Sequence, residues 1–450
     1  MKSISKVLLF AVALLVSAGS WAQQPGGKPF SVQQAVEYAI KNRPSVQAAQ
    51  LDVQSAKARI GEIRSIGLPQ VDAQVDIGNN LAIQTVFLPG IFAGDTTAGA
   101  IFPAQFGTKY NGNAGINASQ LLFDGSYLIG LRAAQTYAEL SVKQVKQTEI
   151  EVADAVTRAY YTVLITEARM PLLDVNITRL DTILRQTQAM NREGFVETID
   201  VQRLEVARNN LQTEKDKLMR LQALSYQLLK FNMGMPQTEV ITLTDKLNDI
   251  EVNTLATAGE TPDYSQRIEY SVLQTQQRLA ELDLRNKRAG YYPRLFLAGR
   301  LGYNTGTDDL GELTKFNQNW YKFSFVGVSL QVPLFDGLRK HYQTKQAKLT
   351  IEKTRYGFKE LENAIDLQLA QARISLQNAR EQLQTQRRNR ELAQEVARVT
   401  QIKYREGVGS NLEVVTAEAE LRTADINYFG ALYDLIIAQV DLQKATGTLY

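Results

Sequence analysis

The sequence predicts a protein of mixed helix and strand, in which paired strands lead into very long helices and this unit occurs twice. Phe123-Asp124-Gly125 and Phe335-Asp336-Gly337 each follow a β-like run and precede a helical run. Arg192-Glu193-Gly194 returns as Arg405-Glu406-Gly407 at nearly the same offset in residue number. A period kept this closely over such a distance indicates duplication of one structural unit.

The first 22 residues have the pattern of a secretory signal peptide. Lys2 and Lys6 form a basic start, Val7–Val16 an apolar core and Ser20-Trp21-Ala22 a small-x-small cleavage site. The alternative is a membrane anchor, but an apolar core of roughly ten residues is too short to span a bilayer as a helix. Because cleavage removes two lysines, the formal charge falls from +3 to +1. This near-neutral balance argues against nucleic acid as a partner.

The composition excludes several kinds of chemistry. The chain has no cysteine, which excludes disulfides, thiolate metal sites and a lipidated cysteine. Its single histidine, His341, stands beside Arg339 and Lys340, where we expect it to be solvated. No phosphate-binding glycine loop, HExxH or GxSxG motif occurs. We therefore expect no enzymatic activity, no cofactor and no bound metal.

The first half contains two β-like runs followed by helix. Residues 70–77 and 110–120 alternate apolar and polar side chains, which predicts a strand pair at about 69–84 and 109–122. Long helices follow over about 125–232. Within them, Pro171 removes an amide donor and clashes with the preceding turn, so we expect a kink or a break there.

The second half follows the same order. The predicted strands cover about 293–304 and 319–333, and the apolar parity changes near Gly327, which indicates a bulge or a change of environment. Helices follow over about 336–446. All 11 prolines lie at or before Pro333, so nothing interrupts a helix of about 100 Å.

Apolar residues repeat along these helices at a spacing close to 3.5, which is typical of helices packed as coiled coils. An ordinary helical bundle is the alternative. The three predicted seams are Leu204, Ala207, Leu211, Leu218, Leu221 and Leu228; Ile365, Leu369, Ala372, Leu376, Ala379 and Leu383; and Leu412, Val415, Ala419, Ile426, Phe429, Tyr433, Ile436 and Val440.

We divide the mature chain into a first repeat at 23–234, a linker at 235–263 and a second repeat at 264–450. Each repeat begins with a helix before its strand pair.

The pattern of the predicted strands fits either transmembrane strands or a sheet with one face in water. Four strands cannot enclose a lumen, and lipid does not tolerate open sheet edges, so transmembrane strands would require several chains. Three copies would supply 12 strands.

In its order of motifs, the chain resembles the TolC family of outer-membrane efflux ducts. The resemblance rests on FSVQQAVEYAIKNRPSVQAAQ near the start, both LFDG joints, both REG turns and the closing LQKATGTL. It implies a homotrimer with a 12-stranded β-barrel in outer-membrane lipid, continuous with an α-helical barrel that crosses the periplasm. It also implies two partners, a periplasmic adaptor (membrane fusion) protein and an inner-membrane pump.

The repeated motifs have structural interpretations. Asp124 and Asp336 are expected to cap the long helices, while Gly125 and Gly337 tolerate the bend from strand to helix. Gly194 and Gly407 are expected to end helices in the left-handed conformation. The hairpins at 191–200 and 404–413 would then be the periplasmic tips.

The resemblance also implies an acidic constriction just after the second REG turn. Glu413 occupies the first of the two acidic positions, whereas Thr416 occupies the second and is not acidic. Asp200 holds the equivalent place in the first half. Our hypothesis is that Glu413 forms a threefold ring with Asp200 nearby, which would favour cations. Alternatively, Glu413 is a solvated acid that complements its helix dipole.

The expected activity is passive efflux of small toxic compounds. Type I protein secretion through the same fold and a soluble periplasmic coiled-coil protein are the alternatives.

Four aromatic residues at the ends of the predicted strands fit either an aromatic girdle at the membrane interfaces or ordinary sheet packing. They are Tyr291, Tyr292, Trp320 and Tyr321. The apolar segment 85–106 either folds over the mouth or packs on a neighbouring chain. Sequence alone decides neither this, nor the pump class, nor the resting state of the gate.

Overall fold

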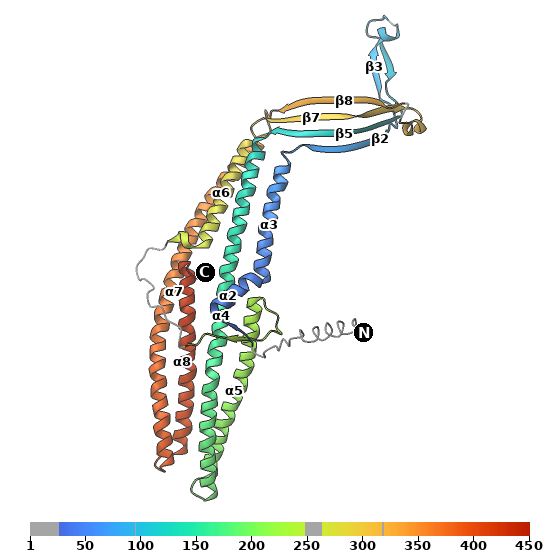
Figure 1. Cartoon of the computed structure of the whole chain (residues 1–450). Helices are drawn as coiled ribbons and strands as arrows, with labels where there is room; N and C mark the ends of the chain where they lie inside the picture. The colour runs from blue at the N-terminus through green and yellow to red at the C-terminus, as the bar shows by residue number, and fades with distance from the viewer. Residues whose placement is uncertain (1–26, 95, 248–262, 317–318) are drawn as a thin grey trace, which may run out of the picture. The chain divides into compact units, whose positions relative to one another are not determined.

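The computed structural model describes residues 27–94, 96–247, 263–316 and 319–450. The predicted signal peptide and most of the predicted linker, 248–262, lie outside them. Helices and strands both occur, as the sequence predicts (Figure 1). Within the described ranges, we find no helix that combines the length and the apolarity needed to cross a membrane.

The elements of the first half end in a pair of long helices. In chain order they are β1 Lys28–Phe30, α2 Val32–Asn42, α3 Pro44–Ser65, β2 Gln70–Asn79, β3 Thr85–Pro89, η1 Gly90–Ala93, β4 Ile101–Gln105, β5 Tyr110–Phe123, α4 Gly125–Arg192 and α5 Thr198–Met233.

The second half repeats this order with fewer strands. Its elements are β6 Ile241–Leu243, η3 Tyr264–Gln266, α6 Ile268–Ala289, β7 Arg294–Thr307, η4 Leu310–Thr314, β8 Tyr321–Gln331, α7 Arg339–Arg405 and α8 Asn411–Thr446. The 68 residues of α4 and 67 of α7 each correspond to about 100 Å of helix.

The four predicted strands form one antiparallel sheet in the order β2-β5-β7-β8. Its register puts apolar residues of all four strands on one face. A typical row joins Ala73, Ile116 and Leu301, and the opposite face carries rows such as Asp72, Asn117 and Arg300. The sheet thus has one apolar and one polar face.

The change of parity in β8 is not a bulge. Its pairing with β7 runs without a register shift from Asn304↔Tyr321 to Arg294↔Gln331. The aromatic side chains of β8 simply lie on the polar face, and Gly327 makes room for them: a Cβ at this position would lie 2.5 Å from the ring of Phe325. The irregularity in this sheet falls instead in β5, between Leu121 and Phe123.

Two smaller sheets are not predicted by the sequence. Strands β3 and β4 form an antiparallel hairpin inside the apolar segment 85–106. Strand β6, in the predicted linker, pairs in parallel with β1, so residues 28–30 bind residues 241–243. Strands as short as these leave too little periodicity to recognise.

The chain forms two compact units, and neither coincides with one repeat. One unit comprises Met1–Gln47, Glu149–Pro262 and Gln368–Tyr450. The other comprises Ala48–Thr148 and Asp263–Leu367 and contains the four-stranded sheet. Each unit therefore takes segments from both halves of the sequence.

The core of the first unit forms where α2 and β6 meet the long helices. Val156, Tyr160 and Leu229 are fully buried in it, and the Tyr160 hydroxyl donates to the Phe30 carbonyl at 2.9 Å. Charged side chains join α4 to α8 nearby: Lys444 Nζ lies 2.7 Å from Asp154 Oδ2, and Arg158 binds Asp441. In the other unit, Lys143 Nζ donates to Thr275 Oγ1 at 2.8 Å.

Helix α4 does not break at Pro171, because it runs without interruption from Gly125 to Arg192. Leu173, Ile177 and Leu180, in the turns after the proline, are buried against α5, and this packing stabilises the helix beyond the proline. Of the predicted kink or break, the break is therefore wrong, and a kink stays a prediction.

The predicted seams are only partly correct. In α7, the residues from Ile365 to Ala379 in the predicted seam are buried. In α5, Leu204, Leu211 and Leu218 are buried, but Leu221 and Leu228 are about half exposed. In α8, Phe429, Ile436 and Val440 of the predicted seam are buried, but residues on another side are buried as well, because apolar residues lie on more than one side of this helix. Its buried residues include Val414, Ala417, Leu421, Ala424, Ala431, Leu435, Ala438 and Leu442.

Candidate constriction at the ends of the helical hairpins

The two long helical hairpins turn in the same way. Gly194 and Gly407 both have φ +76°, the left-handed conformation that the sequence predicts. The amide of Phe195 donates to the Met190 carbonyl at 2.9 Å, and the amide of Val408 donates to the Lys403 carbonyl at 3.0 Å. Both bonds close a Schellman turn at the end of a helix. The neighbouring Arg192, Glu193, Arg405 and Glu406 are all exposed.

The helices that leave these turns begin differently. Ser410 caps α8, since its Oγ accepts from the Glu413 amide at 3.2 Å. The Ser410 hydroxyl also lies 3.3 Å from Glu413 Oε1. Glu197, which precedes α5, makes no such side-chain cap. Glu413 thus occupies the third position of its helix, where a negative charge is favourable.

The three predicted constriction residues have different surroundings. Glu413 and Thr416 are exposed and lie one turn apart on the same face of α8. Asp200 is half-buried in the first turn of α5, and its carboxylate lies 3.5 Å from Arg203 Nη1. An exposed pair of side chains is available to line a pore, whereas Asp200 already has a cationic partner.

Two hydrogen bonds join the hairpins near their turns. The side-chain amide of Asn411, which is buried, donates to the Asp200 carbonyl at 2.6 Å. The hydroxyls of Thr187 and Tyr404 are 2.7 Å apart, and both residues are buried. These contacts fix the start of α8 and the end of α7 against the hairpin formed by α4 and α5.

A buried ion pair lies farther along the hairpins. Arg179 Nη1 donates to the two carboxylate oxygens of Glu418 at 3.1 and 3.3 Å, and its Nη2 donates to Asn176 Oδ1 at 3.1 Å. Only 7% of the Glu418 side chain is exposed. Burial raises the pKa of Glu418, and the charge of Arg179 partly opposes this effect. Asp425, on the same helix, binds Arg390 Nε at 2.7 Å.

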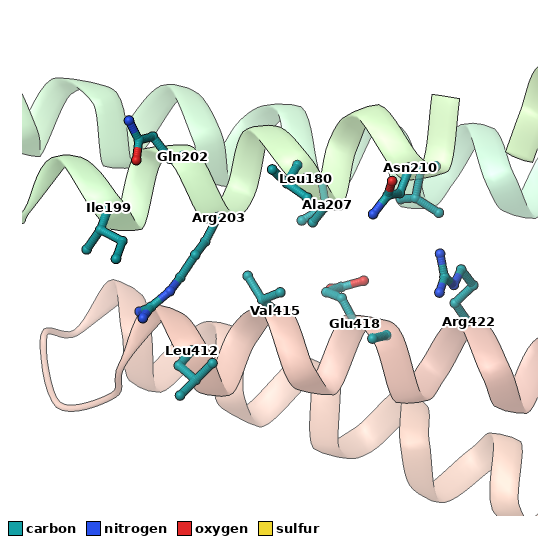
Figure 2. A pocket seen from close by; sticks show the side chains of 13 residues that line it. Leu180, Ile199, Gln202, Arg203, Ala207, Asn210, Leu412, Val415, Glu418 and Arg422 are labelled. Carbon is teal, nitrogen blue, oxygen red and sulfur yellow. The ribbon is translucent and has the colours of Figure 1, made fainter. Parts of the chain in front are cut away.

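Between these contacts, α5 and α8 leave an open groove of about 510 Å³ (Figure 2). Leu412 and Val415, which are predicted to lie in a packed seam, line this groove with Ile199 and Ala207 of α5. Leu412 is 55% exposed. The predicted α8 seam therefore faces an open groove at this end of the helix, although Phe429, Ile436 and Val440 farther along are buried.

The two strand-to-helix joints differ. At the first, Phe123 ends β5, and Asp124 Oδ1 accepts from the Ser126 amide at 2.7 Å as helix α4 begins at Gly125. Asp124 also lies 3.4 Å from Arg294 Nε. Gly125 does not need a glycine conformation here, since it has no positive φ.

At the second joint, the strand ends earlier. Strand β8 stops at Gln331, so Phe335 lies in an irregular segment and is exposed. Gly337 and Leu338 both have positive φ, +66° and +67°, and Asp336 Oδ2 accepts from the Lys340 amide at 3.1 Å. Of the two joints, only this second one needs glycine for its bend. Helix α7 begins at Arg339, two residues after the Phe335-Asp336-Gly337 motif.

Sequence reasoning missed the residues that join the hairpins. Glu418, Asn411, Tyr404 and Thr187 have no predicted role. For Glu418 and Asn411 the reason is that the predicted seam of α8 leaves out the side of the helix on which both are buried. A usable signal is present: Glu418 is adjacent to Ala417 and three residues before Leu421, so these residues share one side of a helix with it. Within the described residues, no cluster of histidine and acidic side chains could hold a metal ion.

Comparison with known proteins covers nearly the whole chain. Residues 35–229 and 267–448 match the model of a family described as outer membrane efflux protein. The chain is 23% identical over 442 residues to the probable efflux pump outer membrane protein TtgC of Pseudomonas putida, and the alignment covers 96% of this chain and 86% of that protein.

Two further matches bear on activity and on fold. The alkaline protease secretion protein AprF of Pseudomonas aeruginosa is 24% identical, with 74% of this chain and 69% of that protein covered. The crystal structure of the Campylobacter jejuni CmeC outer membrane channel superposes with a TM-score of 0.71 at 16% identity. That match covers 93% of this chain and 86% of CmeC, and it supports the fold.

Proposed function

Because this chain belongs to the outer membrane efflux protein family, which confirms the predicted resemblance, we propose that it is a passive, trimeric exit duct. It lies in the outer membrane, extends into the periplasm and serves efflux. Small toxic compounds enter at the hairpin ends and leave through a barrel to which each copy contributes four strands. A periplasmic adaptor and an inner-membrane pump are its partners.

The four-stranded sheet is the observation that carries this proposal. Its apolar face is exposed, with Val71, Val75 and Val326 each at least two-thirds accessible. Its polar face includes the bond from Asn117 Nδ2 to Asp72 Oδ2 at 3.0 Å. Strands β2 and β8 are its free edges. An apolar face toward lipid and a polar face toward water are what the wall of a membrane pore requires.

The free edges require more than one chain. A closed barrel with a lumen needs about eight strands or more, and lipid excludes an unpaired edge. If β2 of one copy pairs with β8 of the next, three copies close a ring of 12 strands. The same three copies would contribute six long helical hairpins, two from each chain.

The long helices suit the aqueous part of the duct. Helices α4 and α7 each extend for about 100 Å, which is far longer than a compact domain needs. The capped joints at Asp124 and Asp336 mark where strand gives way to helix. We assign the turns at 192–194 and 405–407 to the periplasmic ends, where a partner protein would dock.

Trimer formation tests the duct directly. The full-length protein, extracted from outer membranes in mild detergent, should migrate as a trimer before heating and as a monomer afterwards. Reconstituted in planar bilayers, it should give single-channel currents. Recovery of the mature chain in the soluble periplasmic fraction would instead support the coiled-coil alternative and contradict the duct.

Protein secretion is the second candidate, favoured by the similarity to AprF. The two activities separate in a strain that lacks this gene. Loss of efflux predicts increased accumulation of a fluorescent dye and sensitivity to detergents, both restored by the gene on a plasmid. Unchanged accumulation together with loss of one secreted protein would favour secretion.

The constriction proposal predicts a specific change in ion selectivity. In a trimer, the exposed carboxylate of Glu413 forms a threefold acidic ring with Thr416 one turn away and Asp200 in the neighbouring hairpin. Glu413→Gln should lower the preference for cations in asymmetric salt, because it removes the ring's charge. Glu420→Gln, at another exposed position of α8, serves as the matched control. Equal ion selectivity in both variants would show that Glu413 only stabilises the N-terminus of α8 and does not line the pore.

A further inference from the structure

The hairpin formed by β3 and β4 is an apolar ribbon without a partner in the described chain. It lies in the connection between β2 and β5 and pairs with no strand of the four-stranded sheet (Figure 1). Between Asn80 and Lys109 the sequence contains a single charged residue, Asp95. This composition is unusual for a loop, since connecting segments are ordinarily polar.

Both faces of the ribbon are apolar. The register pairs Phe87 with Pro103 and Leu88 with Phe102, so successive pairs lie on opposite faces. One face carries Thr85, Phe87, Pro89, Ile101, Pro103 and Gln105, and the other carries Val86, Leu88, Phe102 and Ala104. Only the pair at the base, Thr85 and Gln105, is polar, and Gln105 Nε2 lies 3.4 Å from Thr85 Oγ1.

These side chains are exposed in the single chain. Phe87 is 66% exposed and Phe92, just beyond the strand, is 72% exposed. With Val86, Ile91, Ile101 and Phe102, they present on the order of 700 Å² of apolar surface, taking roughly 200 Å² for each fully exposed large side chain. This area is divided between the two faces of the ribbon and the turn at its tip, so each neighbour would cover roughly half of it, about the size of the large apolar patches on soluble monomers, about 300–600 Å².

The base of the ribbon is fixed to the end of the sheet. The amide of Asn80 donates to the Lys109 carbonyl at 2.7 Å, and its side-chain amide donates to the Thr108 carbonyl at 2.8 Å. Asp308, after β7, accepts from the Lys109 amide at 2.8 Å. The ribbon therefore starts from a defined place at the rim of the sheet.

We propose that the β3–β4 hairpins of three copies pack against one another to form an apolar stem at the outer mouth of the duct, an inference that rests on the proposed trimer. In a threefold ring, every hairpin has two neighbours and offers them different faces. A ribbon that is apolar on both faces meets this requirement. A hairpin that covered only its own barrel would need one apolar face.

Water and lipid are poorer surroundings for the same ribbon. An isolated two-stranded hairpin is marginally stable in water, and here it would also leave its phenylalanines hydrated. In the hydrocarbon of a membrane, the outer edges of both strands would have unpaired backbone groups. Between two neighbouring hairpins, the faces are buried while the edges can reach water.

Paired cysteines test the stem, because the natural chain contains no cysteine to interfere. Phe87 and Phe102 lie on opposite faces, so links between neighbouring copies join all three chains, whereas a link within one hairpin leaves the chain monomeric on a denaturing gel. In whole cells, a short bifunctional maleimide should convert the Phe87→Cys/Phe102→Cys variant into a covalent trimer, with loss of the monomer band on a denaturing gel. Each single variant should yield no covalent trimer.

The control pair is Leu310→Cys/Phe316→Cys, in the exposed connection between β7 and β8. It should remain largely monomeric under the same treatment. Migration of each variant before heating and its conductance before cross-linking establish that the duct itself is intact. A native trimer with normal conductance but no more covalent trimer than the control would overturn the stem and leave the duct standing.

Two other outcomes also count against the stem. If a fluorophore at Phe87→Cys is quenched by quenchers carried on lipid tails, the hairpin lies in the membrane. If the unmodified protein forms no trimer, the proposed duct fails, and the stem fails with it.

Discussion

The two helical hairpins have matching backbones but make unequal contributions to the contacts between them. Both consist of a helix of 68 or 67 residues and one of 36, joined by a turn with glycine at φ +76°. From the second hairpin, Tyr404, Asn411 and Glu418 reach across, while the first supplies Thr187, the Asp200 carbonyl and Arg179. The two halves thus share the geometry of the turn and differ in several of the side chains that join them: Asn191 stands in the place of Tyr404, and Thr198 in the place of Asn411.

The largest effect is expected from breaking the buried ion pair. Glu418→Ala leaves the Arg179 guanidinium without its carboxylate in an apolar seam. The expected loss of local stability is about 2–3 kcal/mol. This is less than for a fully buried ion pair, because Arg179 is partly exposed. Hydrogen exchange in α8 measures this loss. Glu420→Ala, at an exposed site on the same helix, should leave exchange unchanged. Equal protection in both variants would mean that the pair does not hold the hairpins together.

A smaller effect is expected at the turn itself. Asn411→Ala removes the 2.6 Å bond to the Asp200 carbonyl from a buried site, at a cost of about 1–2 kcal/mol. Exchange should accelerate at the start of α8 and, because the contact is shared, at the start of α5. Acceleration in α8 alone would show that the first hairpin does not depend on the second.

The matching backbones predict equal responses at the two turns. Gly194→Ala and Gly407→Ala each force alanine into the left-handed region and should cost about 1 kcal/mol. An added Cβ would meet no other atom within 4 Å at either site, so no further cost is expected. At Gly234, by contrast, it would lie 2.7 Å from the Arg43 Cα, and Gly234→Ala should cost clearly more. Thermal unfolding of the three variants would reveal any difference between the turns.

The smallest effect concerns pH. Burial raises the pKa of Glu418, and Asp425 adds to the increase while Arg179 opposes it. Since the folded carboxyl binds its proton more tightly than the unfolded one, its contribution to stability falls as the pH rises from about the ordinary value of 4.5 through the raised pKa. The melting temperature of the unaltered protein minus that of Glu418→Gln should therefore decrease over this range. A constant difference would mean that Arg179 fully compensates for the burial.

The parts predicted well from sequence are those fixed by local chemistry. The left-handed glycines, the cap at Asp124 and the four alternating strands depend on neighbouring residues, so their patterns are visible in the chain itself. The contacts of Asn411 and Glu418 depend on which side of α8 is buried. Because α8 has apolar residues on more than one side, its periodicity permits two answers, and only the position of α5 decides between them.

The remaining errors have similar causes. Pro171 predicts a kink or a break, but the helix does not break there, because packing on both sides of the proline keeps it intact. The change of parity near Gly327 permits a bulge or a change of environment, and the bulge is wrong, because β8 pairs without a register shift and Gly327 accommodates the Phe325 ring. Strands β1 and β6 are very short and lie far apart in the sequence, so no pattern within either one reveals the other. Each of these features depends on side chains or strands that the short-range sequence pattern around it does not reveal.

The mixed origin of the compact units has a consequence for biogenesis. Strand β1 cannot pair before β6 is present, and Asp154 of α4 has to await Lys444, close to the carboxyl end. During export, the first half can pack α4 against α5, but the side chains of α4 that bind α8 stay without their partners until the last turns of α8 arrive. Such long-range closure slows folding and exposes the chain to aggregation. We therefore expect truncation after Gly430 to send the whole chain to periplasmic proteases rather than to yield a shortened duct.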